Sequence, residues 1–372
     1  MSETSDRLAE SGRKTLGLLV DPGAPAEIAG QIADDLTAVS CAHQDGVRWQ
    51  VRTEVRTLPP LTDAYDDLLA VASERIHEDG LDGIVCMTDS PLRDGRYALV
   101  ADLLRTARVA LVSLPAFGAL PLRRHVGAVA AELTQELTEP PERHQSKEGE
   151  QQESGAATKS RRFHRVHSPD ADVTVRITAS HAPLRLLVGM VRANQPWRLL
   201  GGLKGALAAA LATSAYVLIS PTLWQFADQV SGLKLALMTV FATAGMVTWL
   251  ITAHNLWERP ADPLKRSRVR LFNASTLVTL LIGVGCGYVV LFAVNLLAEA
   301  FLIDPGFLRV NLGHPTTIGD YLAIAWFTSS VAVLAGAVGS NFEDESTVRR
   351  AAYSRREGER RQADDRGNDG HQ

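Results

Sequence analysis

Four long apolar stretches in the second half of the chain limit its fold more than any other feature. They cover residues 199–221, 235–253, 274–303 and 321–340. A helix needs about 20 apolar residues to cross a hydrocarbon core about 30 Å thick, and all four stretches match that length. Within lipid, one such segment can satisfy its own backbone only as a helix. The sequence therefore predicts an all-α bundle of four transmembrane helices over residues 199–341.

The basic residues around these stretches predict how the bundle is oriented. They precede the first stretch, separate the second from the third and follow the fourth: Arg185, Arg192, Arg198, Lys204, Arg259, Lys265, Arg266, Arg268, Arg270, Arg349, Arg350, Arg355 and Arg356. The other two loops contain only Lys234 and Arg309, both close to aspartates. Because basic loops remain on the cytoplasmic side, we expect a multi-pass cell-membrane protein with both termini in the cytoplasm.

Composition limits the expected partners and cofactors. A net charge of -4 over 372 residues does not favour a nucleic-acid partner. The three cysteines, Cys41, Cys86 and Cys286, have no paired spacing, and the histidines are scattered. We therefore expect no metal site and no cofactor. The soluble part has no dinucleotide, phosphate-loop or hydrolase motif, so no catalytic residue is assigned and a non-enzymatic role is favoured.

The first half of the chain alternates between two periodicities. Short apolar runs that end in turn residues predict strands at 15–20, 47–58, 83–87 and 109–114. Apolar residues at helical spacing predict helices at 25–39, 65–77, 96–107 and 122–137. This alternation predicts a cytoplasmic α/β domain over residues 14–138, small and doubly wound, with a mainly parallel sheet.

The remaining segments connect or flank these two parts. We expect a disordered N-terminus at 1–13 and a polar linker at 139–180 that contains a short extended arm. Residues 181–198 predict an interfacial amphipathic segment under the membrane, and 342–372 predict a charged cytoplasmic tail.

Two loops of the α/β domain are candidate binding sites. In open α/β sheets, ligands bind at the carboxyl ends of strands where the strand order reverses. Asp21 and Gly23 follow the first predicted strand, and the loop after the third contains Thr88, Asp89, Ser90 and Arg93. Such residues could hold a small-molecule ligand or a cytoplasmic protein. The same residue types also cap helices and form turns, so a purely structural role is the alternative.

The apolar stretches contain a few polar side chains and many glycines. Asn295 and Glu299 are one helical turn apart, and an ionisable residue near hydrocarbon is a functional candidate. Because Glu299 is near the end of a long stretch, we expect it to be interfacial and hydrated. His254 ends the second stretch and is expected to cap a helix. Close helix packing is expected at Gly201, Gly205, Gly283, Gly285, Gly287 and Gly336, with homo-oligomerisation through these spans as an open alternative.

Four segments carry a resemblance to a known group of proteins. They are LGLLVDPG, GIVCMTDSPLR, VALVSLPAFGAL and the ending AGAVGSNFEDESTVRRAAYSRRE. Together with the four spans, they resemble uncharacterised actinobacterial four-span integral membrane proteins. The resemblance implies an N-terminal cytoplasmic α/β domain and a lipid-embedded bundle, and it implies no particular activity.

Three hypotheses for function follow from the sequence. The first is a membrane-anchored ligand-sensing or protein-interaction module. The second is a transport component with Asn295, Glu299 and His254 as polar lining. The third is a membrane-bound enzyme with Asp21 and Asp89 as metal ligands or acid and base. The absence of a catalytic motif favours the first hypothesis, and the charge-poor spans count against the second.

Overall fold

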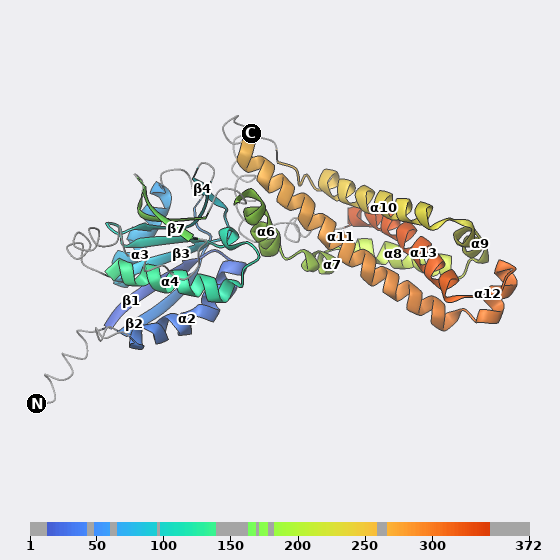
Figure 1. Ribbon diagram of the computed structural model, residues 1–372, viewed down its shortest axis with the longest axis horizontal. Helices are drawn as coiled ribbons and strands as arrows, with labels where there is room; N and C mark the ends of the chain where they lie inside the picture. The colour runs from blue at the N-terminus through green and yellow to red at the C-terminus, as the bar shows by residue number, and fades with distance from the viewer. Residues whose placement is uncertain are drawn as a thin grey trace, which may run out of the picture. The chain divides into compact units, whose positions relative to one another are not determined.

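The computed structural model of the protein describes residues 13–42, 48–59, 65–94, 97–138, 163–168, 171–177, 182–258 and 266–342 (Figure 1). The described chain forms two compact units, the first reaching Ala193 and the second beginning at Asn194. The expectations for residues 1–12, for the polar stretch up to residue 162 and for the tail beyond residue 342 lie outside the described residues.

The first unit is built on a mixed sheet. Its eight strands are β1 (Arg13–Val20), β2 (Arg48–Val55), β3 (Gly83–Thr88), β4 (Leu92–Asp94), β5 (Tyr97–Leu104), β6 (Val109–Ser113), β7 (Phe163–Ser168) and β8 (Ala171–Ile177). The order is β2-β1-β3-β6-β5-β8-β7, and β4 pairs with β5. The first four strands in this order are parallel to one another, and all pairings of β5, β7 and β8 are antiparallel. The α/β class is thus confirmed, although only half of the sheet is parallel.

The helix expected at residues 96–107 is a strand, β5. Its residues from Ala98 to Leu104 are all buried, and they pair with β6 on one side and β8 on the other. Apart from Asp102, the segment is apolar, and a short apolar run has no period that separates a buried helix from a buried strand. The tight return to β6, in which Arg108 has φ of 54°, leaves no room for a crossover.

Part of the expected linker also belongs to the sheet. Residues 171–177 form β8 beside β5, and residues 163–168 form β7 beside β8. Without them the edge of β5 would expose unpaired backbone groups next to a buried strand. The sequence predicted one short extended arm in this region. This segment joins the sheet because β5 offers it an open edge of backbone hydrogen-bonding groups.

Three helices cover the two faces of the sheet. Helices α2 (Ala24–Ala42) and α4 (Leu122–Thr138) pack against each other, with Ile32 against Gly127. On the other face, Leu68 and Ala72 of α3 (Asp66–Asp79) share an apolar cluster that includes Leu19 of β1 and alternate residues of β3. This layering buries both faces of the central strands, which explains their nearly continuous apolar sequence.

The second unit consists of helices. They are α7 (Leu199–Gly202), α8 (Lys204–Leu218), α9 (Pro221–Gln229), α10 (Gly232–Ala253), α11 (Arg266–Leu302), α12 (Pro305–Leu312) and α13 (Ile318–Gly339), with short 3₁₀ turns at η3 (Pro196–Arg198) and η5 (Ser340–Phe342). Within the described residues, α10, α11 and α13 are long and apolar enough to cross a membrane, and α8 with α9 makes a fourth if the bent pair is one span.

The first expected span, at residues 199–221, is not one continuous helix. The chain breaks at Leu203, and α9 is bent by 91° from α8 after a break at residues 219–220. Pro221 begins α9, where its missing N–H donor is tolerated. At about 1.5 Å per residue, α8 alone is only about 22 Å long, shorter than a hydrocarbon core.

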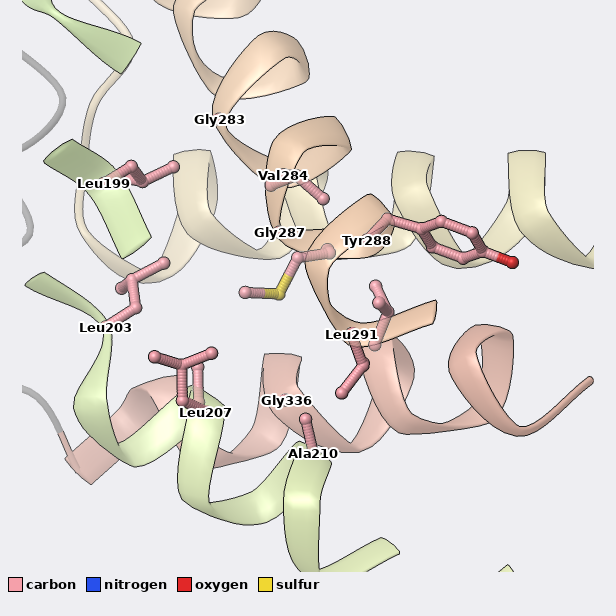
Figure 2. Close-up of a pocket in the computed structure, with 13 residues that line it drawn as sticks. Leu199, Leu203, Leu207, Ala210, Gly283, Val284, Gly287, Tyr288, Leu291 and Gly336 are labelled. Atoms are coloured by element: carbon pink, nitrogen blue, oxygen red, sulfur yellow. The ribbon is translucent and has the colours of Figure 1, made fainter. Parts of the chain in front are cut away.

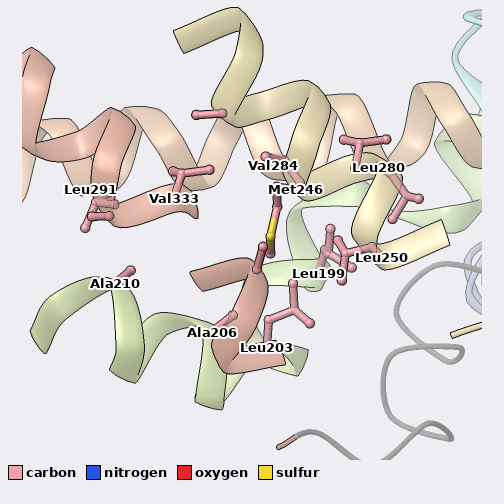
Figure 3. Close-up of a cluster of buried hydrophobic side chains, with 14 of the residues drawn as sticks. Leu199, Leu203, Ala206, Ala210, Met246, Leu250, Leu280, Val284, Leu291 and Val333 are labelled. Atoms are coloured by element: carbon pink, nitrogen blue, oxygen red, sulfur yellow. The ribbon is translucent and has the colours of Figure 1, made fainter. Parts of the chain in front are cut away.

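Helix α13 is the centre of the bundle. Of its apolar segment, 61% is buried, compared with 28% for α10 and α11. One large apolar cluster joins α7, α8, α10, α11 and α13, and it includes Leu203, Met246, Leu280 and Val333 (Figure 3). A second cluster near the start of α13 includes Ile303, Ile324 and Phe327.

Glycines allow close approach at some of the predicted positions. A Cβ at Gly283 would lie 2.6 Å from Leu199 Cδ2, and one at Gly336 would lie 3.1 Å from the Ala206 carbonyl oxygen. Around Gly201 and Gly285, the space is open. Close packing is therefore confirmed at Gly283 and Gly336, but the prediction is wrong for Gly201 and Gly285.

The pair Gly283 and Gly285 offers a matched test of this packing. We expect Gly283→Ala to lower the free energy of unfolding by about 1–3 kcal/mol, because the new methyl group overlaps Leu199. Gly285→Ala on the same helix should leave it unchanged or raise it by about 0.5–1 kcal/mol. Thermal unfolding of the full chain in detergent measures both, and equal effects of the two substitutions would contradict the packing.

Candidate functional site

The sheet places the predicted strand-end residues where the strand order reverses. Strands β1 and β3 are neighbours, and the chain leaves them in opposite directions, from β1 to β2 and from β3 towards β6. Asp21 follows β1, while Thr88 ends β3 and is followed by Asp89 and Ser90. The carboxyl ends of these strands thus meet at the switch point of the sheet, where α/β proteins bind ligands.

Asp21 joins three strand ends through hydrogen bonds. Its backbone N–H donates to the Met87 carbonyl at 3.0 Å, and the Leu58 N–H, beyond β2, donates to its Oδ1 at 2.8 Å. The carboxylate is fully buried. Gly23 then turns the chain with φ of 99°, a conformation that favours glycine, and its carbonyl accepts the Glu27 N–H in α2.

The loop after β3 is also held by its own side chains. Thr88 Oγ1 accepts the Ser90 N–H at 3.0 Å, and Ser113 Oγ at the end of β6 donates to the Ser90 carbonyl at 2.7 Å. Asp89 is 8% exposed and Ser90 is 7% exposed. Arg93 lies further along, in the short strand β4 that pairs with β5. The described conformation therefore uses these polar groups to fix the ends of the strands.

Cys86 is a neighbour of this site that the sequence did not single out. It lies in β3 and is fully buried. Burial raises the pKa of its thiol far above the ordinary value, and the negative charge of Asp21 raises it further. Because only the thiolate is a good nucleophile, Cys86 is an inert core residue in this state.

We expect Asp21→Asn to destabilise the α/β domain. The substitution removes the charge that strengthens the hydrogen bond from the Leu58 N–H, and buried hydrogen bonds to charged groups contribute about 1.5–3 kcal/mol. Thermal unfolding of the full chain measures the loss, with Asp34→Asn on the exposed side of α2 as the control. Equal midpoints for the two variants would show that Asp21 does not join the strand ends as described.

A second group of polar side chains lies inside the helical bundle. It comprises Thr239 of α10, Tyr288, Asn295 and Glu299 of α11, and Trp326, Thr328, Ser329 and Ser330 of α13. We call this group the polar belt. Along α10 and α13, it separates the two apolar clusters of the bundle. Its members on α13 are near the middle of that helix.

Hydrogen bonds connect the three helices at the belt. Trp326 Nε1 donates to Thr239 Oγ1 at 2.7 Å, and the Tyr288 and Ser330 hydroxyls lie 3.0 Å apart. Asn295 Nδ2 donates to Ser329 Oγ at 3.0 Å. Polar side chains of one helix thus find partners on another, as apolar surroundings require.

Glu299 is not the hydrated interfacial residue that the sequence predicted. Its side chain is 1% exposed and faces Thr328, whose Oγ1 lies 3.3 Å from Oε1. The other carboxyl oxygen, Oε2, is buried and has no hydrogen-bond partner among the described residues. The prediction assumed that a residue late in a long apolar stretch lies at its outer, hydrated end. In the structure, α11 begins further back, at Arg266, and Glu299 lies beside Thr328 in the middle of α13.

His254 is not part of the belt. It caps the C-terminus of α10 and is 4% exposed, in agreement with the predicted capping role. The next helix, α11, begins at this end of the bundle, and Glu299 lies about 50 Å along it at about 1.5 Å per residue. The structure therefore brings Asn295 and Glu299 together and leaves His254 apart.

A small apolar cavity lies between α8, α11 and α13 (Figure 2). Its volume is about 60 Å³, and glycines at 283, 287 and 336 contribute to its walls. Figure 2 shows that the Tyr288 ring borders the cavity while its hydroxyl points away from it. An apolar cavity of this size offers a water molecule no partners, so we interpret it as a packing gap beside close-packed glycines.

One cluster could hold a metal ion among the described residues. Asp228 of α9, His314 before α13 and Asp320 in the first turn of α13 place one ligand atom each within 4.8 Å of one another. His314 Nε2 lies 3.2 Å from Asp228 Oδ2. The pKa of His314 is raised by its hydrogen bond to the Pro315 carbonyl and then by Asp228. No sequence spacing connects these three residues, which explains why they were missed.

The His314 pair predicts a pH-dependent stability. The pKa of His314 is higher in the folded protein than its ordinary value of 6.5. The pair's contribution to stability is therefore fully present below pH 6.5 and is lost as the pH rises through the folded pKa. We expect the thermal midpoint to decrease on that alkaline side in the wild type. His314→Gln and Asp228→Asn should flatten this decrease, and an unchanged profile in both variants would contradict the pairing.

No protein-family model, curated protein or solved structure matches the chain. The resemblance to actinobacterial four-span membrane proteins therefore stays a prediction.

Proposed function

We propose that the protein is a membrane-anchored sensing module of the cell membrane, with both termini in the cytoplasm. In this proposal, the α/β domain binds a small ligand or a protein at the carboxyl ends of β1 and β3. The helical unit holds it in the bilayer and receives the signal. The basic residues before the first span and at the start of α11, among them Arg268 and Arg270, support the orientation.

The observation that carries this proposal is the attachment of α6 (Ala182–Asn194) to the η1 turn (Leu114–Phe117). Arg185 Nε donates to the Ala116 carbonyl at 2.8 Å, and Arg192 Nη1 donates to the Leu120 carbonyl at 2.8 Å. A Cβ at Gly189 would lie 2.1 Å from the Pro115 carbonyl oxygen, so the backbones are in direct contact. In sequence, α6 leads straight into the helical unit.

The same turn is connected to the strand ends. Ser113, the last residue of β6, immediately precedes η1, and its hydroxyl donates to the Ser90 carbonyl in the loop after β3. A ligand that moved this loop would therefore act on η1 and, through Arg185, on α6. Such a contiguous series of contacts is a physical route for coupling between the loop and α6.

Two alternatives have less support. A transport component is favoured by the polar belt of the bundle, but His254 is far from Asn295 and Glu299. A membrane-bound enzyme would use Asp21 and Asp89, but both are buried, and Oδ1 of Asp21 already accepts a hydrogen bond from Leu58. Sensing needs only a shift of these loops, so we place it first.

Hydrogen exchange on the full chain in lipid nanodiscs tests the proposal. A thermal-shift screen of nucleotides, divalent metals, folates and common metabolites first selects a compound that stabilises the protein. We expect that compound to slow exchange in two places, the loop at residues 88–93 and the α6 helix. Arg185→Ala should keep the first effect and lose the second, because it removes the contacts with η1.

Arg124→Ala serves as the control, since Arg124 is exposed on α4. It should preserve both effects. Protection of the strand-end loop without any change in α6 of the wild type would contradict the relay. If the compound slows hydrogen exchange elsewhere but not in the strand-end loop, the proposed binding site is wrong.

A further inference from the structure

We propose that the polar belt is a binding site for a small monovalent cation, with the Glu299 carboxylate as its charged ligand. Na⁺ and H⁺ are the two cations with the required chemistry, since both bind a carboxylate oxygen. This inference concerns the helical unit alone and is independent of the sensing role of the α/β domain.

The first argument is that Glu299 has no counter-charge. Its side chain is 1% exposed, and no described residue forms an ion pair with it. The helices around it contain arginine and lysine only near their starts, at Lys204 in α8, Lys234 in α10 and residues 266–270 in α11. A buried carboxyl group must be neutralised by a proton or paired with a cation, because an isolated charge in an apolar medium costs many kcal/mol.

The second argument is that its hydrogen bonding is incomplete. Thr328 has a single hydroxyl proton, and this hydroxyl lies 2.7 Å from the Ile324 carbonyl but 3.3 Å from Glu299 Oε1. The shorter bond takes the proton, so two oxygens face each other at Glu299 and Thr328 without a good hydrogen bond. Oε2 has no hydrogen-bond partner in the described part of the chain. A cation between these oxygens would satisfy all of them.

The third argument is the type of ligand present. Within one helical turn, the site contains a carboxylate, the hydroxyls of Thr328 and Ser329, and the amide of Asn295. These are hard oxygen donors, which prefer hard cations to soft metals. A single carboxylate balances one positive charge, so the site suits a monovalent ion.

Few other ionisable groups face this carboxyl. On α13, Tyr321 is within electrostatic range, and its hydroxyl donates to the Ile303 carbonyl at 2.9 Å. Asp304 caps α12 through bonds to Gly306 and Phe307, and Asp320 caps α13 through Thr317. The part of α10 from Leu235 to Ala253 has no ionisable side chain. Glu299 is therefore the buried acid that distinguishes the belt.

The apolar clusters on both sides close the site. Ile303, Ile324 and Phe327 pack on one side, and Leu291 and Val333 pack on the other. Exchange of the cation therefore requires the helices to move. The bend between α8 and α9 lies beside this region, because Trp224 of α9 packs in the same cluster as Ile303.

The test is thermal unfolding of the full chain in nanodiscs, with NaCl replaced by choline chloride at constant ionic strength. The wild type should show a midpoint that rises with Na⁺ and saturates, as binding to the folded state requires. Glu299→Gln should abolish the rise. Thr328→Val keeps the shape and the charge but removes one ligand oxygen, so it should raise the half-saturating Na⁺ concentration about tenfold or more.

A second series varies the pH in choline chloride and separates H⁺ from Na⁺. If H⁺ is the cation, the wild-type midpoint changes with pH, Glu299→Gln reduces that change, and Na⁺ has no effect. Asp34→Asn removes a carboxylate from the exposed side of α2 and should leave both responses intact. If Glu299→Gln does not fold, the comparison of Thr328→Val with the wild type decides.

The proposal is overturned if the wild type responds to neither cation. It is also overturned if Glu299→Gln folds and responds to both cations as the wild type does.

Discussion

A hydrocarbon core supplies no water, so each polar group inside it must be satisfied by the protein itself. The helical unit meets part of this constraint at the polar belt, where side chains of three helices bond to one another. Thr239, Tyr288 and Ser330 bond to one another across three helices, and Asn295 bonds to Ser329. Above and below the belt, the helices contact each other through apolar side chains and glycines. Among the described residues, Glu299 is the acidic side chain of this unit that is left with a buried oxygen without a partner.

The α/β domain solves a related problem at the ends of its strands. Strands buried on both faces leave polar groups at their carboxyl ends that also need partners. Asp21, Thr88, Ser90 and Ser113 supply these partners, and each of them holds a neighbouring loop. The turn that follows Ser113 is then held by Arg185 of α6. The strand ends and the attachment of α6 are thus connected through Ser113 and the turn that follows it.

Much of this fold could be predicted because its elements have strong local patterns. The strands at β1, β3 and β6 and the helices α2, α3 and α4 follow from apolar runs and helical spacing. β5 could not be predicted, because Tyr97–Leu104 is apolar apart from Asp102 and has no clear helical or strand period. Its identity is decided by pairing with β6, which follows after a tight turn, and with β8, which is distant in sequence.

The candidate sites show the same division between local and tertiary information. The sequence placed Asp21 and Thr88 at strand ends, and sheet order brought them together. It also placed Asn295 and Glu299 on one helical face, but the depth of Glu299 depends on its contact with Thr328, 29 residues away. Asp228, His314 and Asp320 meet only through the packing of α9 against α12 and α13.

The central claim is that Glu299 is sequestered among the helices and neutralised there by a cation. Infrared spectroscopy of the full chain in lipid, recorded as the difference between wild type and Glu299→Gln in Na⁺ and again in choline, tests this most directly. The account predicts a protonated carboxylic acid band in choline that converts to a carboxylate band in Na⁺, or persists if H⁺ is the cation. In either case, Glu299→Gln should remove the acid band. An ionised, hydrated carboxylate under both conditions would contradict the account.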